Sequence, residues 1–257
     1  MKTLKILTAT MLLLVAMAAG AETISEVTIG NLVYSLDTDT KVATVTGYDR
    51  SNKPTDVVIP NTIKYGGNYS VTTIGKSAFY NCTSLASVNI PNSVTTIGGW
   101  AFENCTSLAS VNIPNSVTTI GEKAFYNCTS LASVNIPNSV TTIGEGAFSA
   151  CSSLTSISVA SDNPNYIGID GVLFNKDKTM IVVYPARKYG SEYTIPNSVT
   201  TIGKWAFENC TSLASVNIPN SVTTIGGWAF YCCTSLASVN IPNSVTTIGN
   251  RAFYYCI

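Results

Sequence analysis

Hydrophobic and polar residues alternate at the start of a unit that recurs along most of the chain. In one such unit, Val88 and Ile90 alternate with Ser87 and Asn89. A period of two residues is typical of a strand with one buried face. Each unit is therefore predicted to begin with a short strand.

The second half of the unit predicts a bend, an extended stretch and a turn. Pro91 ends the strand because it cannot donate to a ladder. Val94 and Ile97 are the next apolar positions, and Gly98 permits a tight turn after them. Further apolar residues follow at helix-like spacing and predict a short helical turn: Ala101, Phe102, Cys105 and Leu108.

This unit repeats many times, and the repetition predicts the fold class. The segment Ile90–Gly98 recurs at a spacing of 23 residues with one longer interval, starting at Ile113, Ile136, Ile195, Ile218 and Ile241. One unit cannot bury its apolar face alone, so neighbouring units stack. We expect a β-dominated, right-handed leucine-rich-repeat solenoid. Its repeats span 57–159 and 195–257, with an enlarged repeat at 160–194 and a last unit that ends mid-repeat.

Residues 1–56 lack the repeat and divide into two parts. Lys2 and Lys5 precede an apolar run, and Ala19-Gly20-Ala21 is a small-residue cleavage site. Residues 1–21 are therefore predicted to be a signal peptide, with a retained anchor as the alternative. Residues 22–56 contain the strand candidates Leu32–Tyr34 and Val42–Val45. We expect this part to be a β-rich cap that covers the first coil.

Charge and composition exclude several classes of function. Lysine and arginine total 14, aspartate and glutamate total 14, and only 11% of residues are charged. Nucleic-acid binding needs a concentrated basic face, which this balance does not supply. The chain has no histidine, and it shows no paired carboxylates or activated nucleophile. We therefore expect no enzymatic activity, no cofactor, no metal site and no membrane span in the mature chain.

The repeat closely resembles that of a known family. Leu85-x-x-Val88-x-Ile90 fits the strand signature of leucine-rich repeats. The whole unit resembles the BspA-like surface proteins, whose units look like LxxVxIPxxVxxIGxxAFxxCxx, over about residues 57–257. Asp170–Lys178 with Tyr184-Pro185 also looks like an insertion found in that family. The resemblance implies an exported bacterial adhesin that binds extracellular-matrix or plasma proteins and promotes coaggregation.

Seven of the eight cysteines share one position of the repeat. Equivalent side chains in a stack point in parallel, so their Cβ atoms lie farther apart than a disulfide prefers. We interpret the column as buried, reduced thiols, with a disulfide framework as the alternative in an exported protein. Cys232 lies outside the column, where most units carry Asn. The predicted structural thiol ladder comprises Cys82, Cys105, Cys128, Cys151, Cys210, Cys233 and Cys256.

A few columns vary among otherwise near-identical copies, and we expect them to face solvent. They are the two residues after Ile-Gly and the residue after Ala-Phe. Exposed Trp and Tyr are favoured anchors in recognition; ordinary surface variation is the alternative. The enlarged repeat adds further candidates, although it could equally serve a structural purpose. The candidate contact residues are Trp100, Trp205, Trp228, Tyr80, Tyr126, Tyr231, Tyr254, Tyr166, Arg187, Lys188 and Tyr189.

The strand face carries rows of Ser and Asn, such as Ser87/Ser110 and Asn89/Asn112. These rows suit many weak hydrogen bonds, and solubility explains them equally well. The favoured function is an exported surface protein that binds a protein or glycan ligand, such as a matrix protein. The alternatives are a structural or decoy array without a ligand, or a glycan-binding module. The C-terminal coil, which lacks a polar cap, is a candidate for end-to-end self-association.

Overall fold

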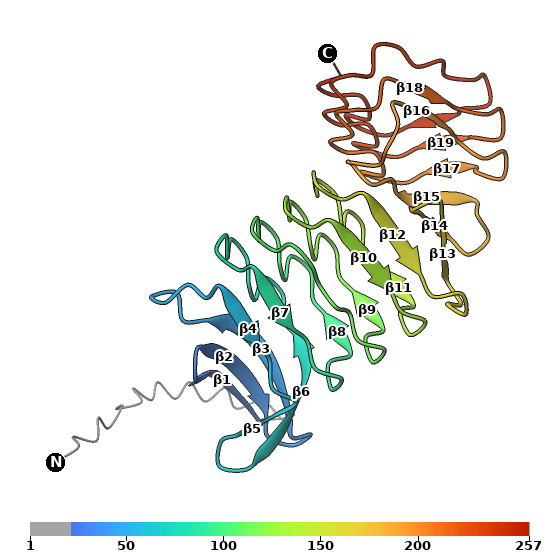
Figure 1. Cartoon of the computed structure of the whole chain (residues 1–257). Coiled ribbons are helices and arrows are strands. Elements are labelled where there is room, and N and C mark those ends of the chain that lie inside the picture. The colour runs from blue at the N-terminus through green and yellow to red at the C-terminus, as the bar shows by residue number, and fades with distance from the viewer. Residues whose placement is uncertain (1–21, 257) are drawn as a thin grey trace.

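The computed structural model describes residues 22–256, which wind into a solenoid of stacked coils (Figure 1). The predicted signal peptide, residues 1–21, lies outside the described part. Between residues 22 and 256 the regular structure consists of short β-strands, and no segment forms a helix. The predicted leucine-rich-repeat solenoid is therefore confirmed, with turns in place of its short helical segments.

An antiparallel unit covers the N-terminal end of the stack. Its strands are β1 (Thr23–Ile29), β2 (Leu32–Asp37) and β3 (Val42–Tyr48), which pair in that order. Strand β3 then pairs in parallel with β6 (Asn68–Ile74), which also pairs with β5 (Thr62–Lys64). The stack therefore begins on a strand edge that the cap supplies.

A row of short Thr-Ile strands runs along each half of the stack. In the N-terminal half, β6 is followed by parallel strands: β8 (Thr96–Ile97), β9 (Thr119–Ile120) and β11 (Thr142–Ile143). In the C-terminal half the row contains β15 (Met180–Val183), β17 (Thr201–Ile202), β19 (Thr224–Ile225) and β20 (Thr247–Ile248). These ladders hold equivalent residues of successive coils in register.

The strands predicted at the start of each unit form a second row, which is interrupted. Three parallel pairs make up the row: β4 (Asp56–Val58) with β7 (Ser87–Asn89), β10 (Ser133–Ile136) with β12 (Ser156–Val159), and β16 (Glu192–Thr194) with β18 (Ser215–Asn217). Residues 110–112 and 238–240 occupy equivalent positions and form no strand. The coils are therefore less tightly bonded on this side.

The predicted helical turn is instead a pair of consecutive turns. The amides of Ala101 and Cys105 donate to the carbonyls three residues earlier, as turns do. Trp100 and Asn104 adopt positive φ values of 57° and 61°, which end any helical run. At the start of these turns, a Cβ on Gly98 would lie 2.8 Å from the backbone of the preceding coil. The close approach of neighbouring coils selects turns over a wider helix.

The core is a set of columns that contain one side chain from each coil. The ring centroids of Phe79 and Phe102 lie 5.1 Å apart, with an interplanar angle of 1°. The column of stacked rings continues as far as Phe148, stops there, and begins again at Tyr184. Eight coils each contribute one ring, at Phe79, Phe102, Phe125, Phe148, Tyr184, Phe207, Phe230 and Phe253. The break between Phe148 and Tyr184 divides the core into two clusters.

The enlarged fifth coil lies at this break. After β12 it contains β13 (Tyr166–Ile169), β14 (Val172–Asn175) and β15, which form antiparallel pairs. The hairpin expected around residues 175–178 is confirmed by the pairing of β14 with β15. Leu173 belongs to the N-terminal core, and its neighbour Phe174 belongs to the C-terminal core. Strand β14 therefore joins the two halves of the molecule.

Candidate functional site

The variable residues of the repeat gather along one edge of the solenoid, which we call the turn edge. The amide of Trp100 donates to the carbonyl of Glu122 in the next coil at 2.8 Å, and equivalent bonds recur in other coils. Main-chain bonds therefore hold the turns, whereas side-chain identity is free to vary. The second residue after Ile-Gly has a positive φ in Ser77, Trp100, Lys123, Gly146, Trp205, Trp228 and Arg251.

Several aromatic residues of the turn edge are exposed, as the sequence predicts. Tyr80 is 38% exposed and Tyr254 is 46% exposed. Trp100 is half-buried, with the ammonium of Lys76 4.7 Å from its ring centroid, a cation–π contact. Tyr231, also half-buried, stacks on Tyr254 with centroids 6.0 Å apart. Two separate groups of rings therefore reach the surface, one near each end of the stack.

Trp205 does not face solvent, and the expectation that it would is wrong. Only 8% of the residue is exposed. Its ring packs against Gly146, where a Cβ would lie 3.2 Å from Cε3. The ammonium groups of Lys123 and Lys204 lie 4.8 and 4.3 Å from the ring centroid. Trp228 stacks on the ring with centroids 5.2 Å apart.

One stretch of the enlarged fifth coil is shorter than its counterpart in a regular unit, and this difference explains the burial. Ile181 pairs with Ile202 and so has the repeat position of Ile97. In a regular unit the core ring is the fifth residue after this isoleucine, as Phe102 is after Ile97. In the fifth coil, Tyr184 is only the third residue after Ile181. Tyr184 still takes the ring position of its coil, because its amide donates to Ala206 as regular units do. The coil consequently lacks the outward turn, so the fourth and sixth coils meet at the turn edge. Variation in a column therefore does not guarantee exposure.

A buried carboxylate lies at the same junction. Glu208 is 4% exposed, and its Oε1 accepts a hydrogen bond from the hydroxyl of Tyr126 at 3.0 Å. Its Oε2 is buried without a partner. Burial raises the pKa of Glu208 to about 7, partly opposed by the Tyr126 hydrogen bond and the charge of Lys123. Ser149, also buried, donates to the carbonyl of Trp205. Ser149 and Glu208 belong to the variable column after Ala-Phe, and the expectation that this column faces solvent is wrong for both residues.

The four candidate residues of the enlarged repeat have different roles. The hydroxyl of Tyr166 accepts a hydrogen bond from the amide of Ile143 at 2.8 Å and so caps the edge of β11. Lys188 donates to the carbonyl of Asp170 at 2.6 Å. Arg187 is exposed, and Tyr189 is 99% exposed. The structure therefore gives Tyr166 and Lys188 structural contacts and leaves Arg187 and Tyr189 available to a partner.

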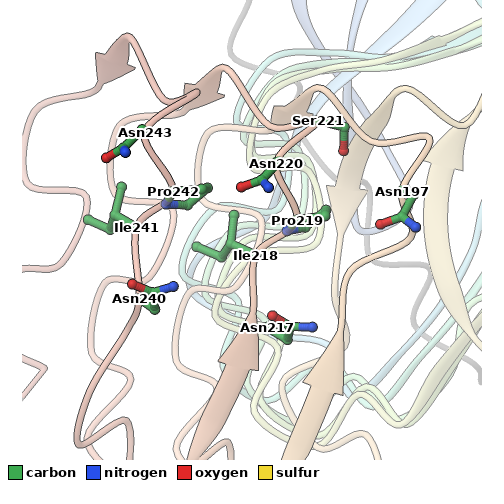
Figure 2. Close-up of a pocket in the computed structure, with 10 residues that line it drawn as sticks. All are labelled: Asn197, Asn217, Ile218, Pro219, Asn220, Ser221, Asn240, Ile241, Pro242 and Asn243. Carbon is green, nitrogen blue, oxygen red and sulfur yellow. The ribbon is translucent and has the colours of Figure 1, made fainter.

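A polar groove crosses the last three coils on the side of the Ser-Asn strands (Figure 2). Its volume is about 670 Å³, within the range of ligand pockets. It opens beside β18, where residues 238–240 of the next coil form no strand. We call it the Asn groove, and its lining residues are Asn197, Asn217, Ile218, Pro219, Asn220, Ser221, Asn240, Ile241, Pro242 and Asn243.

The repeat pattern predicts only part of this groove. The polar row of the strand face that contains Asn89 and Asn112 continues to Asn217 and Asn240. The asparagines that follow each Ile-Pro, such as Asn220 and Asn243, were not expected beside that row. The recurring Asn-Ile-Pro-Asn segment was the available signal, because the bend at Pro returns the second Asn to the same side.

The repeated cysteines form a buried column whose thiols bond to the backbone. All eight cysteines are free, and six are buried. The thiol of Cys128 donates to the carbonyl of Phe102 at 3.2 Å, and Cys151 donates likewise to Phe125 at 3.1 Å. Burial raises the pKa of the Cys151 thiol to about 12. These thiols thus satisfy a carbonyl of the preceding coil and stay protonated.

Stacked coils, short strand ladders and inward Leu, Val, Ile and Phe columns define the class as a leucine-rich-repeat solenoid. The family profile described as "BspA type Leucine rich repeat region (6 copies)" matches residues 49–170 and 187–257. The chain belongs to this family of BspA-type leucine-rich repeat proteins. No curated protein matches the sequence significantly.

Solved structures of bacterial repeat proteins share the fold. A leucine-rich repeat protein from Eubacterium ventriosum is 30% identical, with a TM-score of 0.67 over 88% of this chain and 68% of that chain. A leucine rich cell surface protein from Faecalibacterium prausnitzii is 28% identical, with a TM-score of 0.56 over 90% of this chain and 80% of that one. The pneumococcal vaccine antigen PcpA is 21% identical, with a TM-score of 0.55 over 88% and 77% of the two chains. This last likeness shows the fold alone.

Proposed function

We propose that the protein is an exported, surface-displayed binding protein that recognises macromolecules of a host or neighbouring cell without catalysing a reaction. The observation that carries this proposal is the Asn groove, whose asparagine side chains make no hydrogen bond within residues 22–256. Arg187, Tyr189 and the exposed tyrosines of the turn edge add further contact groups. Together these features offer a macromolecular partner an extended surface.

Two further features support export and surface display. The similar Faecalibacterium prausnitzii protein is described as a cell surface protein, and residues 1–21 read as an export signal. Residues 22–256 contain no helix that is long and apolar enough to span a membrane. Burial and raised pKa values keep thiols such as Cys128 and Cys151 from acting as nucleophiles.

The test is saturable binding of the chain from residue 22 onward to immobilised matrix proteins, plasma proteins, glycans and whole bacterial cells. We expect binding to at least one of these targets and no turnover of any target. A protein that folds, as judged by circular dichroism, but binds none of them would contradict the proposal. That result would favour the alternative of a structural or decoy repeat array.

We also propose that two copies of the protein associate end to end through the last coil. Its side chains Ile241, Ile248 and Tyr255 are 38%, 50% and 50% exposed. A second copy could cover these apolar groups. Light scattering across a dilution series tests the proposal, and a concentration-independent monomer mass would contradict it. An Ile248→Lys variant should lower the mass of any oligomer.

A further inference from the structure

We propose that the Asn groove binds a neutral polysaccharide chain that runs along the axis of the solenoid. This inference rests on the proposed binding function and adds the chemical class of one ligand and its site. Candidate aromatic anchors lie on the turn edge and in the enlarged repeat, so the groove is a separate surface. Its residues come from three successive coils, the sixth, seventh and eighth.

The lining of the groove selects an uncharged ligand. Its ten lining residues include no lysine, arginine, aspartate or glutamate. A phosphorylated, sulfated or uronic-acid polymer would find no counter-charge there, and burying an unpaired charge is costly. Neutral hydroxyl groups carry no such cost. The groove is therefore suited to neutral sugars.

The arrangement of amides and apolar groups matches the two sides of a pyranose ring. Each asparagine side chain offers two donors and an acceptor, which suits neighbouring hydroxyls that both donate and accept. Figure 2 shows the same order in two adjacent coils, an isoleucine and a proline between two asparagines. Of the apolar groups, half-buried Pro219 and Ile241, which is 38% exposed, reach the surface and can contact the C–H face of a ring while the amides bond its edges. The two sets are Asn217, Ile218, Pro219, Asn220 and Asn240, Ile241, Pro242, Asn243.

The direction of the groove favours a polysaccharide over a peptide. Equivalent asparagines of successive coils, Asn197, Asn220 and Asn243, line it in sequence, so it runs across the strands. A peptide that adds to a sheet edge would run alongside the strands instead. Coils stack at about 4.8 Å, close to the length of one pyranose ring in an extended chain. Each coil can therefore present the asparagine that follows its Ile-Pro to one ring.

The groove amides are ready to bind because the protein does not use them. Some other asparagines of the chain are engaged: Asn127 donates to Asn104 at 2.8 Å, and Asn138 donates to Asp162 at 2.8 Å. No side-chain hydrogen bond involves Asn197, Asn217, Asn220, Asn240 or Asn243 within residues 22–256. A ligand therefore has no internal bonds to break at these positions.

Calorimetric titration with neutral hexasaccharides of β-linked glucose, xylose and mannose tests the inference. We expect one of them to bind, and an Asn220→Ala/Asn243→Ala variant to bind about tenfold more weakly or worse, because hydrogen bonds are lost. The matched control is Asn92→Ala/Asn115→Ala, which changes the same exposed repeat positions outside the groove. The control should bind like the unmodified protein. Tryptophan fluorescence should stay unchanged on binding, because no Trp lines the groove.

Three outcomes would overturn the inference: no neutral hexasaccharide binds, the groove variant binds normally, or both double variants weaken binding equally. The proposed function and the assignment of the groove to glycans can fail independently of each other. If the protein still binds matrix proteins or cells while every hexasaccharide fails, only the assignment of the groove to glycans is wrong. Thermal unfolding of both variants verifies folding, and the exposed positions of these asparagines predict little change in stability.

Discussion

At the scale of single residues, one backbone conformation explains why most units carry Asn at the same position of the repeat. Asn81, Asn104, Asn127 and Asn209 all adopt φ values between 56° and 61°. Asn tolerates this left-handed region better than other non-glycine residues. Cys232 takes the equivalent position with a φ of 58°. Most units carry Asn where this unit carries Cys232, and the backbone indicates that the replacement has a local cost.

We predict that Cys232→Asn stabilises the protein. Asn should relieve about 1 kcal/mol of left-handed strain, and its side chain can continue the ladder seen between Asn104 and Asn127. Urea unfolding followed by circular dichroism measures the change. The reverse substitution, Asn127→Cys, should destabilise by a similar amount. An unchanged or lowered midpoint for Cys232→Asn would show that the column is not selected by its φ.

The thiol column predicts selective chemical reactivity. Cys232 and Cys256 are half-buried, and the other six cysteines are buried. Since the thiolate is the reactive form, the raised pKa of Cys151, about 12, also slows its reaction. A thiol-modifying disulfide reagent should label only Cys232 and Cys256 in the folded protein and all eight after unfolding. Mass spectrometry that located fast labelling at Cys128 would contradict the buried column.

At the scale of elements, the junction between the fourth and sixth coils depends on complementary sizes. Gly146 and Ser149 are small, whereas Trp205 and Glu208 are large and fill the space that the fifth coil leaves. Glu145 and Lys204 also form an ion pair across the junction at 2.8 Å. The pair is solvent-exposed, so it contributes little to stability. The packed Trp ring is the main contact.

We predict that Trp205→Ala destabilises the protein by about 3 kcal/mol or more, as loss of a buried Trp does. Trp100→Ala is the matched control, because Trp100 has the same repeat position and is only half-buried. It should cost much less. Thermal unfolding followed by calorimetry compares the two variants. Equal effects would mean that the junction packing at Trp205 adds nothing to an ordinary turn-edge tryptophan.

At the scale of the whole molecule, the two halves of the stack are connected by few elements. The aromatic column breaks between Phe148 and Tyr184, and separate cores lie on either side. Strand β14 and the junction around Glu208 connect them. Because repeat stacks are stabilised by nearest-neighbour contacts, the state of this junction affects how the halves unfold together.

Stability should decrease as pH rises toward neutrality. The raised pKa of Glu208, about 7 against an ordinary 4.5, means that the folded protein binds a proton more tightly than the unfolded chain between those values. Stability is therefore highest below about pH 4.5 for this group and falls until about pH 7. The total is about 3 kcal/mol, since one pKa unit corresponds to about 1.4 kcal/mol. Glu103, whose pKa burial also raises, acts in the same direction.

A Glu208→Gln variant isolates this contribution. Gln stays uncharged and can still accept the hydrogen bond of Tyr126. Its unfolding midpoint, measured by scanning calorimetry from about pH 5 to pH 8, should change less with pH than that of the unmodified protein. Above pH 7 the variant should be the more stable of the two. Parallel pH profiles for both proteins would exclude a buried, titrating Glu208.

The sequence by itself determined the features of the fold that recur in every coil. The spacing of Val, Ile, Phe, Cys and Leu fixes which side chains point inward and that equivalent residues stack, because each coil contacts its nearest neighbours in register. The solenoid and the place of the enlarged repeat could therefore be predicted. The replacement of a helix by turns could not, since helix and turn share the spacing of Ala101, Phe102 and Cys105.

Only the tertiary structure decided what happens where the repeat is broken. The burial of Trp205 and Glu208 follows from the missing turn of the fifth coil, which brings together units that are not adjacent in sequence. The Asn groove lies where residues 238–240 form no strand beside β18, although their sequence repeats that of β18. Periodicity specifies contacts between identical neighbours, whereas the junction at Trp205 depends on a coil that lacks part of the repeat.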